Sequence, residues 1–402
     1  MLTVKAPASY SGPFAKSLEI LVLQPTPFCN IDCDYCYLTN RNSTQRMSFD
    51  TVKASVRLVL DGGLVSERLC IVWHAGEPLV LPVSYYERMF AAIEEEVHGR
   101  VDISHSFQSN GTLIDDSWCQ FIQKNHVRIG LSIDGPAFLH DLHRKTRHGK
   151  PTHAQVMVGA KRLRQYGIPF HVIAVVSADG LDYAEAIFRF FEELGVREVG
   201  FNVEELEGDH GSSSISRELA TDRIEKFWKQ LYELYESSEG KLQIREFERA
   251  TRAILGSTGK APWQDIAAKN DQVLPFSILS VDCQGRISTF SPELMGSKDA
   301  QYGDFTFGQV GQHDLAAIRT SEPFVQVANE VMRGVKGCAR TCEYFSVCGG
   351  GAPSNKYFEN ASLSSTATMY CRASIQLPMH VVLSRLESKL NLVANHGSAG
   401  KR

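Results

Sequence analysis

The stretch LEILVLQPTPFCNIDCDYC, residues 18–36, joins an apolar run to three closely spaced cysteines. The run at 18–24 is apolar almost throughout, which is typical of a parallel strand that is covered on both faces. Cys29, Cys33 and Cys36 follow with the spacing C-x3-C-x2-C. A structural zinc site normally needs four protein ligands, whereas three thiolates on a four-iron cluster leave one iron open for chemistry. The spacing therefore favours a catalytic iron–sulfur centre; the alternatives are three structural cysteines or a zinc site that a distant ligand completes.

Outward from this stretch, strand-like runs alternate with helical periods as far as residue 202. Further strands are predicted at 69–74, 102–108, 127–133, 170–176 and 198–203. The helical periods between them end at glycines, as at Gly62 and Gly195. This alternation predicts an α/β fold with a parallel sheet or partial barrel, whose six strand candidates fall short of the eight in a closed barrel.

The second half of the chain follows a different pattern. A polar stretch at 204–216 indicates a boundary loop, and a long helix is predicted after it. A hairpin is predicted at 277–290, with its turn at Gln284–Gly285, and a last helix at 375–392. We divide the chain into an N-terminal extension (1–17), a barrel core (18–215), a helical bridge (216–273), a cysteine-containing C-terminal domain (274–392) and a flexible tail (393–402).

The composition excludes several classes of protein. The chain has 402 residues with 42 basic and 46 acidic side chains, and no basic stripe indicates nucleic-acid binding. No window of about 18 apolar residues predicts a transmembrane helix. The N-terminus lacks the apolar core of a secretory signal, so we expect a cytoplasmic protein. In that reducing compartment, clustered cysteines more often bind metal or act in catalysis than form disulfides.

A second cysteine cluster lies near the C-terminus. Cys338, Cys342 and Cys348 precede a run of three glycines, and Cys371 follows later. Four thiolates suit a closed site, either zinc or a fully ligated iron–sulfur cluster, and spacing alone does not separate these. The glycine run would let backbone amides approach the sulfurs. Of the remaining cysteines, Cys70 and Cys119 are interpreted as core residues, and Cys283 as a less favoured ligand candidate beside the hairpin turn.

The first triplet, with Tyr35 before its last cysteine, resembles the signature of radical S-adenosylmethionine (radical SAM) enzymes. The element Trp73-His-Ala-Gly-Glu-Pro78 resembles the GGEP element of that family, in which the backbone and the Glu carboxylate hold the SAM amino group; its first Gly is Ala75 here. Later strand ends match positions that meet the ribose and methionyl part of SAM, and Arg144 matches one that pairs with the SAM carboxylate. The resemblance thus implies SAM contacts from Tyr35, Gly76, Glu77, Asn110, Ser132, Asp134 and Arg144.

The C-terminal cysteines resemble the SPASM extension of radical SAM peptide maturases, which favours iron–sulfur over zinc. The full SPASM pattern carries two auxiliary clusters, but Ala352 and Phe290 stand where it expects cysteines. Both losses fall on the same cluster. The resemblance therefore implies a partial (β/α)6 radical SAM barrel with a C-terminal SPASM-like domain that holds one auxiliary 4Fe–4S cluster through Cys338, Cys342, Cys348 and Cys371.

The stretch GGGAPSNKYFEN, at 349–360, is similar to maturases of glycine-rich-repeat peptides (the GrrM/OscB type). This resemblance implies that the 4Fe–4S cluster cleaves SAM to a 5′-deoxyadenosyl radical, which takes a β-hydrogen from a ribosomally made precursor peptide. The β-carbon then bonds to an aromatic ring, giving a cyclophane. A ferredoxin- or flavodoxin-type reductant and a Gly-rich precursor with aromatic motifs are the expected partners.

Three other interpretations stay open. Two are SPASM reactions, namely thioether cross-linking and formylglycine formation in sulfatases. The third and most remote is a non-catalytic iron–sulfur electron carrier, which would not need Glu77, Asp134 and Arg144. The sequence does not indicate which residue accepts the ring proton.

Overall fold

A curved parallel sheet forms the centre of the structure. The computed structural model describes residues 9–215, 220–256 and 261–399. Its main sheet has the strand order β12-β11-β10-β1-β3-β4-β5-β7-β8-β9. The six predicted strands are confirmed as β1 Ile20–Leu23, β3 Arg68–Trp73, β4 Asp102–Ser109, β5 Arg128–Ser132, β7 Phe170–Val176 and β8 Glu198–Val203. Each pairs in parallel with the next, so their carboxyl ends meet at one edge of the sheet.

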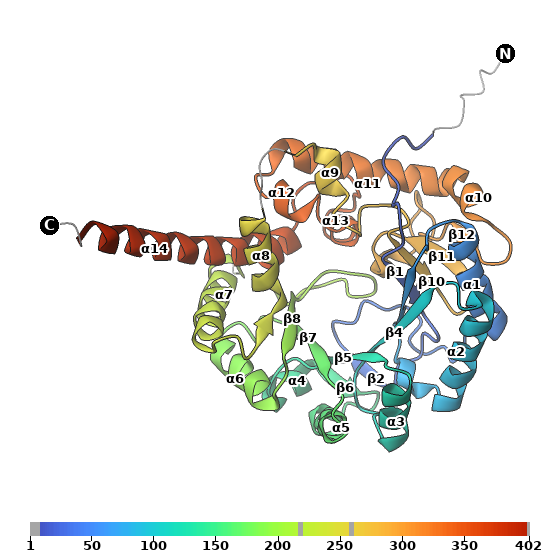
Figure 1. Ribbon diagram of the computed structural model, residues 1–402, viewed down its shortest axis with the longest axis horizontal. Coiled ribbons are helices and arrows are strands. Elements are labelled where there is room, and N and C mark those ends of the chain that lie inside the picture. Colours follow the sequence, from blue (N-terminus) through green and yellow to red (C-terminus); the bar gives the residue numbers. More distant parts are fainter. Residues whose placement is uncertain (1–8, 216–219, 257–260, 400–402) are drawn as a thin grey trace, which may run out of the picture.

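Helices surround the outer face of this sheet (Figure 1). Around the barrel these are α1 Phe49–Asp61, α2 Val83–Val97, α3 Asp116–Lys124, α4 Ala137–His143, α5 His153–Gln165, α6 Ala184–Leu194 and α7 Ala220–Ser237. The second half adds α8 Arg245–Leu255, α9 Trp263–Ala267, α10 Leu315–Thr320, α11 Glu322–Thr341, α12 Phe345–Cys348, α13 Pro353–Asn360 and α14 Leu377–Ala399. Short 3-10 turns lie at Pro78–Val80 and Pro292–Leu294, and a π-helical segment at Cys371–Gln376 precedes α14.

The predicted hairpin is confirmed, but it does more than close a separate domain. β10 (Ile278–Val281) and β11 (Arg286–Thr289) are antiparallel, with Gly285 at the turn in a left-handed conformation. β10 also pairs in parallel with β1, and β12 (Gly308–Gln309) pairs with β11. The hairpin therefore extends the barrel sheet beyond its first strand, while β9 (Gln243–Ile244) extends the other edge.

A small second sheet fixes the cysteine loop. β2 (Ile31–Cys33) pairs antiparallel with β6 (Arg144–Thr146), and Cys33 stands opposite Arg144. A predicted cluster ligand and a predicted SAM contact are thus neighbours in one register.

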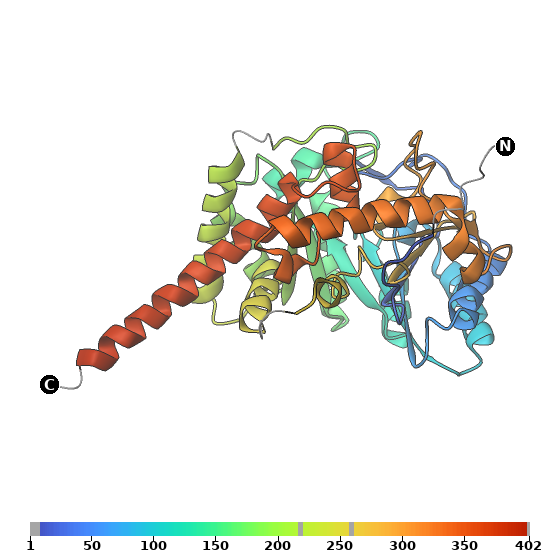
Figure 2. The ribbon, with the colours of Figure 1, turned by 90° about the horizontal axis from the view of Figure 1, so that it is seen from above.

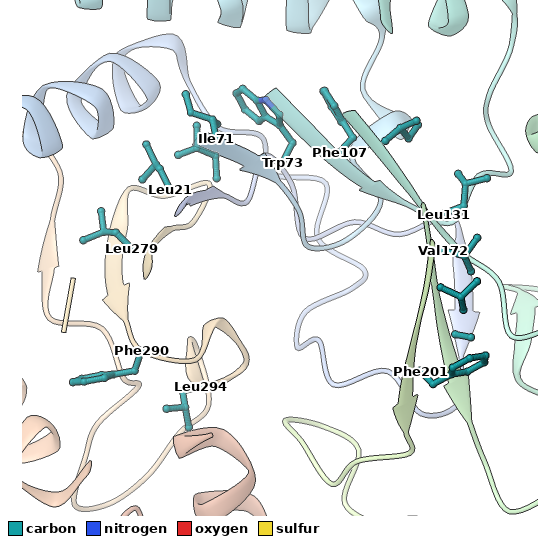
Figure 3. Packing of buried hydrophobic residues seen from close by; sticks show 14 of the residues in the cluster. Leu21, Ile71, Trp73, Phe107, Leu131, Val172, Phe201, Leu279, Phe290 and Leu294 are labelled. Carbon is teal, nitrogen blue, oxygen red and sulfur yellow. The ribbon is translucent and has the colours of Figure 1, made fainter. Parts of the chain in front are cut away.

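Burial alternates along the barrel strands. In β3, Leu69, Ile71 and Trp73 are buried while Cys70 and Val72 are half-buried. Figure 3 shows Ile71, Trp73 and Phe107 on the face turned toward the surrounding helices. Burying each such side chain stabilises the fold by about 1.5–3 kcal/mol. Cys119 is fully buried in α3, as expected of a core residue, whereas Cys70 lies on the opposite face of its strand from this core.

The C-terminal elements cover one side of the barrel. Figure 2 shows α11 and α14 running along the same side of the molecule. The indole nitrogen of Trp228 in α7 donates to the carbonyl of Ala373 at 2.8 Å, which ties the π-helical segment to the barrel helices. α14 continues to Ala399, past the predicted end at residue 392. Among the described residues, no helix is both long and apolar enough to cross a membrane.

Candidate functional site

The loop of Cys29, Cys33 and Cys36 is held against the end of β3. The amide of Glu77 donates to the carbonyl of Phe28 at 2.8 Å. A Cβ at Gly76 would lie 2.5 Å from the carbonyl oxygens of Thr26 and Phe28, so only glycine allows this approach. Ala75, which replaces the first Gly of the GGEP element, keeps a left-handed backbone with φ of 75°. The backbone geometry therefore survives the substitution, at the cost of local strain.

Hydrogen-bond donors point at the sulfurs of this loop. Asn110 Nδ2 lies 3.8 Å from Cys29 Sγ, and Arg144 Nη1 lies 4.0 Å from Cys33 Sγ. Burial, reinforced by neighbouring negative charges, raises the pKa of Cys29 to about 12 and also raises that of Cys33. Several thiolates would not persist together here without a cation, because they repel one another. The donor set therefore fits an iron–sulfur cluster, which both needs and stabilises the deprotonated thiols.

Asp134 and Arg144 form a buried ion pair beside the loop. Asp134 accepts from Arg144 Nε at 2.9 Å and from Nη2 at 3.0 Å, while Val175 N donates to it at 2.9 Å. The Tyr35 hydroxyl donates to the same carboxylate. Burial opposes ionisation of Asp134, but the Arg144 charge outweighs it and holds the pKa of Asp134 below its usual range. The guanidinium also lies 5.4 Å from the centre of the Tyr35 ring.

Glu77 links two strand ends. Its carboxylate accepts from Leu79 N at 2.9 Å, Ser109 Oγ at 2.8 Å and Asn110 N at 2.7 Å. Burial raises the pKa of Glu77 to about 7, although these three hydrogen bonds oppose the rise. The observed contacts of this carboxylate position Asn110 and the 3-10 turn, and its expected contact with SAM stays a prediction.

The predicted SAM contacts converge around the cysteine loop. Asn110 Nδ2 also donates to Asn30 Oδ1 at 2.9 Å, which joins the end of β4 to the loop. Ser132, at the end of β5, accepts a hydrogen bond from Gln108 Nε2 at 3.0 Å. Gln108 lies in β4, two residues before Asn110, so Ser132 is connected to the other predicted SAM contacts through this strand. Tyr35, Gly76, Glu77, Asn110, Asp134 and Arg144 all touch the loop or a residue that does.

The second cysteine set gathers where α11, α12 and the π-helical segment meet. The backbone amides of Gly350 and Gly351 donate toward the sulfur of Cys348, as the glycine run predicts. Thr368 Oγ1 donates to Cys371 Sγ at 3.0 Å, and Lys356 Nζ lies 3.6 Å from Cys338 Sγ. A buried ammonium and several N–H or O–H donors directed at thiols fit an anionic iron–sulfur cluster better than an apolar core.

Apolar side chains fill the positions where a further auxiliary cluster would need cysteines. Phe290 is 1% exposed and stacks on Phe324 with ring centres 6.4 Å apart. Ala352 is also buried. Cys283 is half-buried and lines a cavity of about 280 Å³ together with Tyr37 and Glu293. Its role as a ligand stays a prediction.

Three carboxylates that the sequence analysis did not single out lie between the two cysteine sets. Asn355 Nδ2 donates to Glu205 Oε2 at 2.7 Å and to Glu207 Oε1 at 3.4 Å. Glu293 Oε2 is buried and has no hydrogen-bond partner among the described residues. Burial raises the pKa of Glu205 to about 7, and burial together with the neighbouring carboxylates raises that of Glu207.

One backbone contact and one sequence neighbour place these carboxylates between the cysteine sets. The loop after β8 rests on the residue that follows Cys36, because Asp209 N donates to the Tyr37 carbonyl at 3.0 Å. On the other side, Asn355 immediately precedes Lys356 at the second cysteine set. The pair of glutamates just after a parallel strand was the available sequence signal, since such strand ends commonly carry functional groups.

Residues 23–191 match the family described as the radical SAM superfamily. The chain is also 40% identical over 378 residues to the protein sll1766 of Synechocystis sp., which covers 93% of each chain. The chain belongs to the radical SAM superfamily. This radical SAM protein is therefore an enzyme, and SAM and a 4Fe–4S cluster are its cofactors.

Other known proteins are similar to this radical SAM enzyme over most of its length. It is 24% identical over 396 residues to the serine-type anaerobic sulfatase-maturating enzyme of Bacteroides thetaiotaomicron, covering 93% of this chain and 92% of the other. The structure of anSMEcpe with bound AdoMet superposes with a TM-score of 0.73 at 21% identity, over 92% of this chain and 98% of that one. SuiB of Streptococcus suis bound to the precursor peptide SuiA gives a TM-score of 0.62 at 15% identity, over 89% and 76%. At these identities, the structural matches confirm the α/β fold with its C-terminal domain.

Proposed function

We propose that this radical SAM enzyme cross-links a ribosomally made precursor peptide by joining an aromatic ring to a β-carbon, giving a cyclophane. The observation that carries this proposal is that buried Phe290 and Ala352 stand where a second auxiliary cluster would need cysteines, which leaves Cys338, Cys342, Cys348 and Cys371 as the expected ligands of one auxiliary cluster. It argues against the two-cluster forms of thioether and sulfatase chemistry. The likeness of the stretch at 349–360 to glycine-rich-repeat maturases supports the same conclusion.

The first cysteine loop and the residues around it hold the reacting groups. Cys29, Cys33 and Cys36 bind the cluster that cleaves SAM, and the Asp134–Arg144 pair orients SAM beside it. When bound, SAM and the two clusters supply the 5′-deoxyadenosyl radical that takes the β-hydrogen and the acceptor for the electron released on ring closure. Cys33, Asp134 and Arg144 are buried, which would limit the access of water to the bound groups.

The half-buried carboxylates between the cysteine sets take up the other product of ring closure. After the β-carbon bonds to the ring, the ring carbon loses a proton and one electron to become aromatic again. We assign that proton to the Glu205–Glu207 pair. Asn355, the residue before Lys356, donates to both carboxylates, and the loop that carries them rests on Tyr37, the residue after Cys36. The pair therefore lies between the two cysteine sets. A carboxylate with a pKa near the working pH is suited to this task.

Formylglycine formation in a sulfatase is the second candidate. The similarity to sulfatase-maturating enzymes along 93% of the chain favours it. The two reactions differ in the residue attacked and in the product, which makes them separable by experiment. In either case, the partner is a peptide or protein substrate, with a ferredoxin- or flavodoxin-type reductant and a cytoplasmic location.

Co-expression with the cognate precursor tests the proposal. Each cross-linked motif should be two hydrogens lighter, because one β-hydrogen and one ring hydrogen are lost. A thioether gives the same mass change, so two-dimensional NMR of the isolated fragment must find a ring carbon bonded to a β-methine. A precursor with every cysteine replaced should still react. A requirement for cysteine, or an aldehyde in the product, would instead support one of the other SPASM reactions.

A further inference from the structure

Lys356 is a buried lysine at the second cysteine set. It lies on α13 with 2% of its surface exposed. Its Nζ is 3.6 Å from Cys338 Sγ. Among the described residues, the ion pairs between lysine or arginine and carboxylates do not include Lys356. A buried ammonium destabilises the fold unless an anion lies beside it. The cysteine thiolates of the second set, with Cys338 nearest, are the groups that can compensate this charge.

The backbone leaves space for this ammonium. A Cβ at Gly334 of α11 would lie 2.9 Å from Lys356 Nζ. A Cβ at Gly351 would lie 3.6 Å both from Lys356 Cε and from Cys371 Sγ. A side chain at position 334 would therefore crowd the ammonium, while Gly351 lies in van der Waals range of both the lysine and Cys371.

The charge of Lys356 reaches more than one cysteine. Lys356 Nζ lies 3.6 Å from Cys338 Sγ, and a Cβ at Gly351 would lie 3.6 Å both from Lys356 Cε and from Cys371 Sγ, so the end of the lysine lies beside two of the cysteines. In a buried environment, a fixed positive charge is screened much less than one at the surface. Lys356 is therefore placed to act on the cluster as a whole.

A four-cysteine 4Fe–4S cluster is anionic, and it gains one more negative charge when it takes up an electron. Net charge, hydrogen bonds to the sulfurs and solvent exposure set the reduction potential of such a cluster. A buried ammonium donating to one sulfur stabilises the reduced form more than the oxidised form. Removing the ammonium should therefore make the cluster a weaker electron acceptor.

We propose that Lys356 raises the reduction potential of the auxiliary cluster held by Cys338, Cys342, Cys348 and Cys371. Lys356 acts through the cluster and not on the peptide, so it is a positioning residue and not a catalytic one. Its benefit for the reaction rests on the proposed function. The ring gives up one electron when it becomes aromatic again. A higher reduction potential makes the oxidised auxiliary cluster a better acceptor of that electron.

The experiment measures the auxiliary cluster alone. Cys29, Cys33 and Cys36 are replaced by Ala in the full chain, which is reconstituted anaerobically and titrated with dithionite while the reduced cluster is followed by electron paramagnetic resonance. Lys356→Met, of similar length but uncharged, should lower the equilibrium constant for one-electron reduction at least tenfold, which is a shift of about 59 mV to more negative potential. An unchanged potential overturns the proposal.

Lys336→Met is the matched control. Lys336 lies on α11, two residues before Cys338, but its side chain is exposed and lies over the Trp263 ring. Because solvent screens this charge, we expect its removal to change the reduction constant less than twofold. An equal shift in both variants would mean that general charge, and not the buried contact, sets the potential, and would overturn the proposal.

Further variants cover loss of the cluster. If Lys356→Met does not retain iron, Lys356→Gln is titrated instead, beside Lys356→Arg, which keeps the charge. If only the Arg variant retains iron, the lysine serves assembly of the cluster and the proposal about its potential is overturned. No peptide is used, so these results do not depend on the cross-linking reaction, and a parent chain without auxiliary iron would contradict the auxiliary site itself.

Discussion

At the scale of single residues, the Asp134–Arg144 ion pair joins the cysteine loop to the strand ends where SAM is predicted to bind. Both side chains are buried, and each satisfies the other through two hydrogen bonds. Breaking a buried pair by removing one partner typically costs about 3–5 kcal/mol, because a charge is left uncompensated. The pair therefore positions Tyr35 and the β2–β6 sheet, and the pairing of Arg144 with the SAM carboxylate stays a prediction.

This double role predicts the behaviour of Arg144→Ala. We expect SAM affinity to fall tenfold or more, since a charge-assisted hydrogen bond contributes about 1.5–3 kcal/mol. The variant should also unfold at lower temperature, because Asp134 loses its partner. Equilibrium dialysis with SAM and anaerobic thermal unfolding measure the two effects. Arg144→Ala with Asp134→Asn should regain stability but not SAM affinity; unchanged SAM affinity in the single variant would refute the assignment.

At the scale of elements, the sequence predicts the long strands and misses the short ones. Strand-like runs of four or more residues that alternate with helical periods identify all six barrel strands, and burial in the structure alternates along them, as in β7. β9 and β12 have two residues each, too few to show any periodicity. The pairing of β10 with β1 is a tertiary contact between segments about 250 residues apart, so no local pattern could indicate it.

The same distinction separates the predicted from the missed site residues. Cysteine spacing and strand-end motifs indicate Cys29, Glu77 and Asp134 because those patterns are local. Glu205 and Lys356 are charged residues in polar stretches, and sequence alone treats such residues as solvated. In the structure Lys356 is buried and Glu205 is half-buried, which depends on how the loop after β8 and α13 pack in three dimensions.

Glu205, in the loop after β8, should make the stability of the folded chain depend on pH. Burial raises the pKa of Glu205 to about 7, compared with roughly 4.3 for an exposed glutamate. The folded chain therefore binds this proton more tightly than the unfolded chain does. As pH rises from about 4.3 to about 7, the free energy of unfolding should fall through this group, and the loss should be complete above that range.

Glu205→Gln tests this effect, since its amide oxygen can still accept from Asn355. We expect the melting temperature of the variant minus that of the parent to increase between pH 5 and pH 8, measured anaerobically on reconstituted protein. Glu193→Gln, which changes an exposed residue of α6, should give a difference that does not vary with pH. A constant difference for Glu205→Gln as well would contradict the raised pKa.

At the scale of the whole molecule, the barrel and the C-terminal elements place two cysteine sets on either side of one group of half-buried carboxylates. The first set follows β1, and the second lies where α11, α12 and the π-helical segment meet. Asn355 and Tyr37 connect the carboxylates to the two sides. Because each cysteine set has its own supporting contacts, we expect the two clusters to assemble independently of each other.

Iron analysis tests this independence and the number of clusters together. Anaerobically reconstituted protein should hold about eight irons per chain, from two four-iron clusters. Replacing Cys29, Cys33 and Cys36 by Ala should remove about half of the iron and all SAM cleavage, because the remaining cluster has no open iron. Replacing Cys338, Cys342 and Cys348 should also remove about half of the iron but leave reductive SAM cleavage without peptide.

About twelve irons in the parent would mean that Phe290 and Ala352 do not mark a lost cluster. Zinc at the C-terminal set would remove the electron acceptor from the proposed reaction.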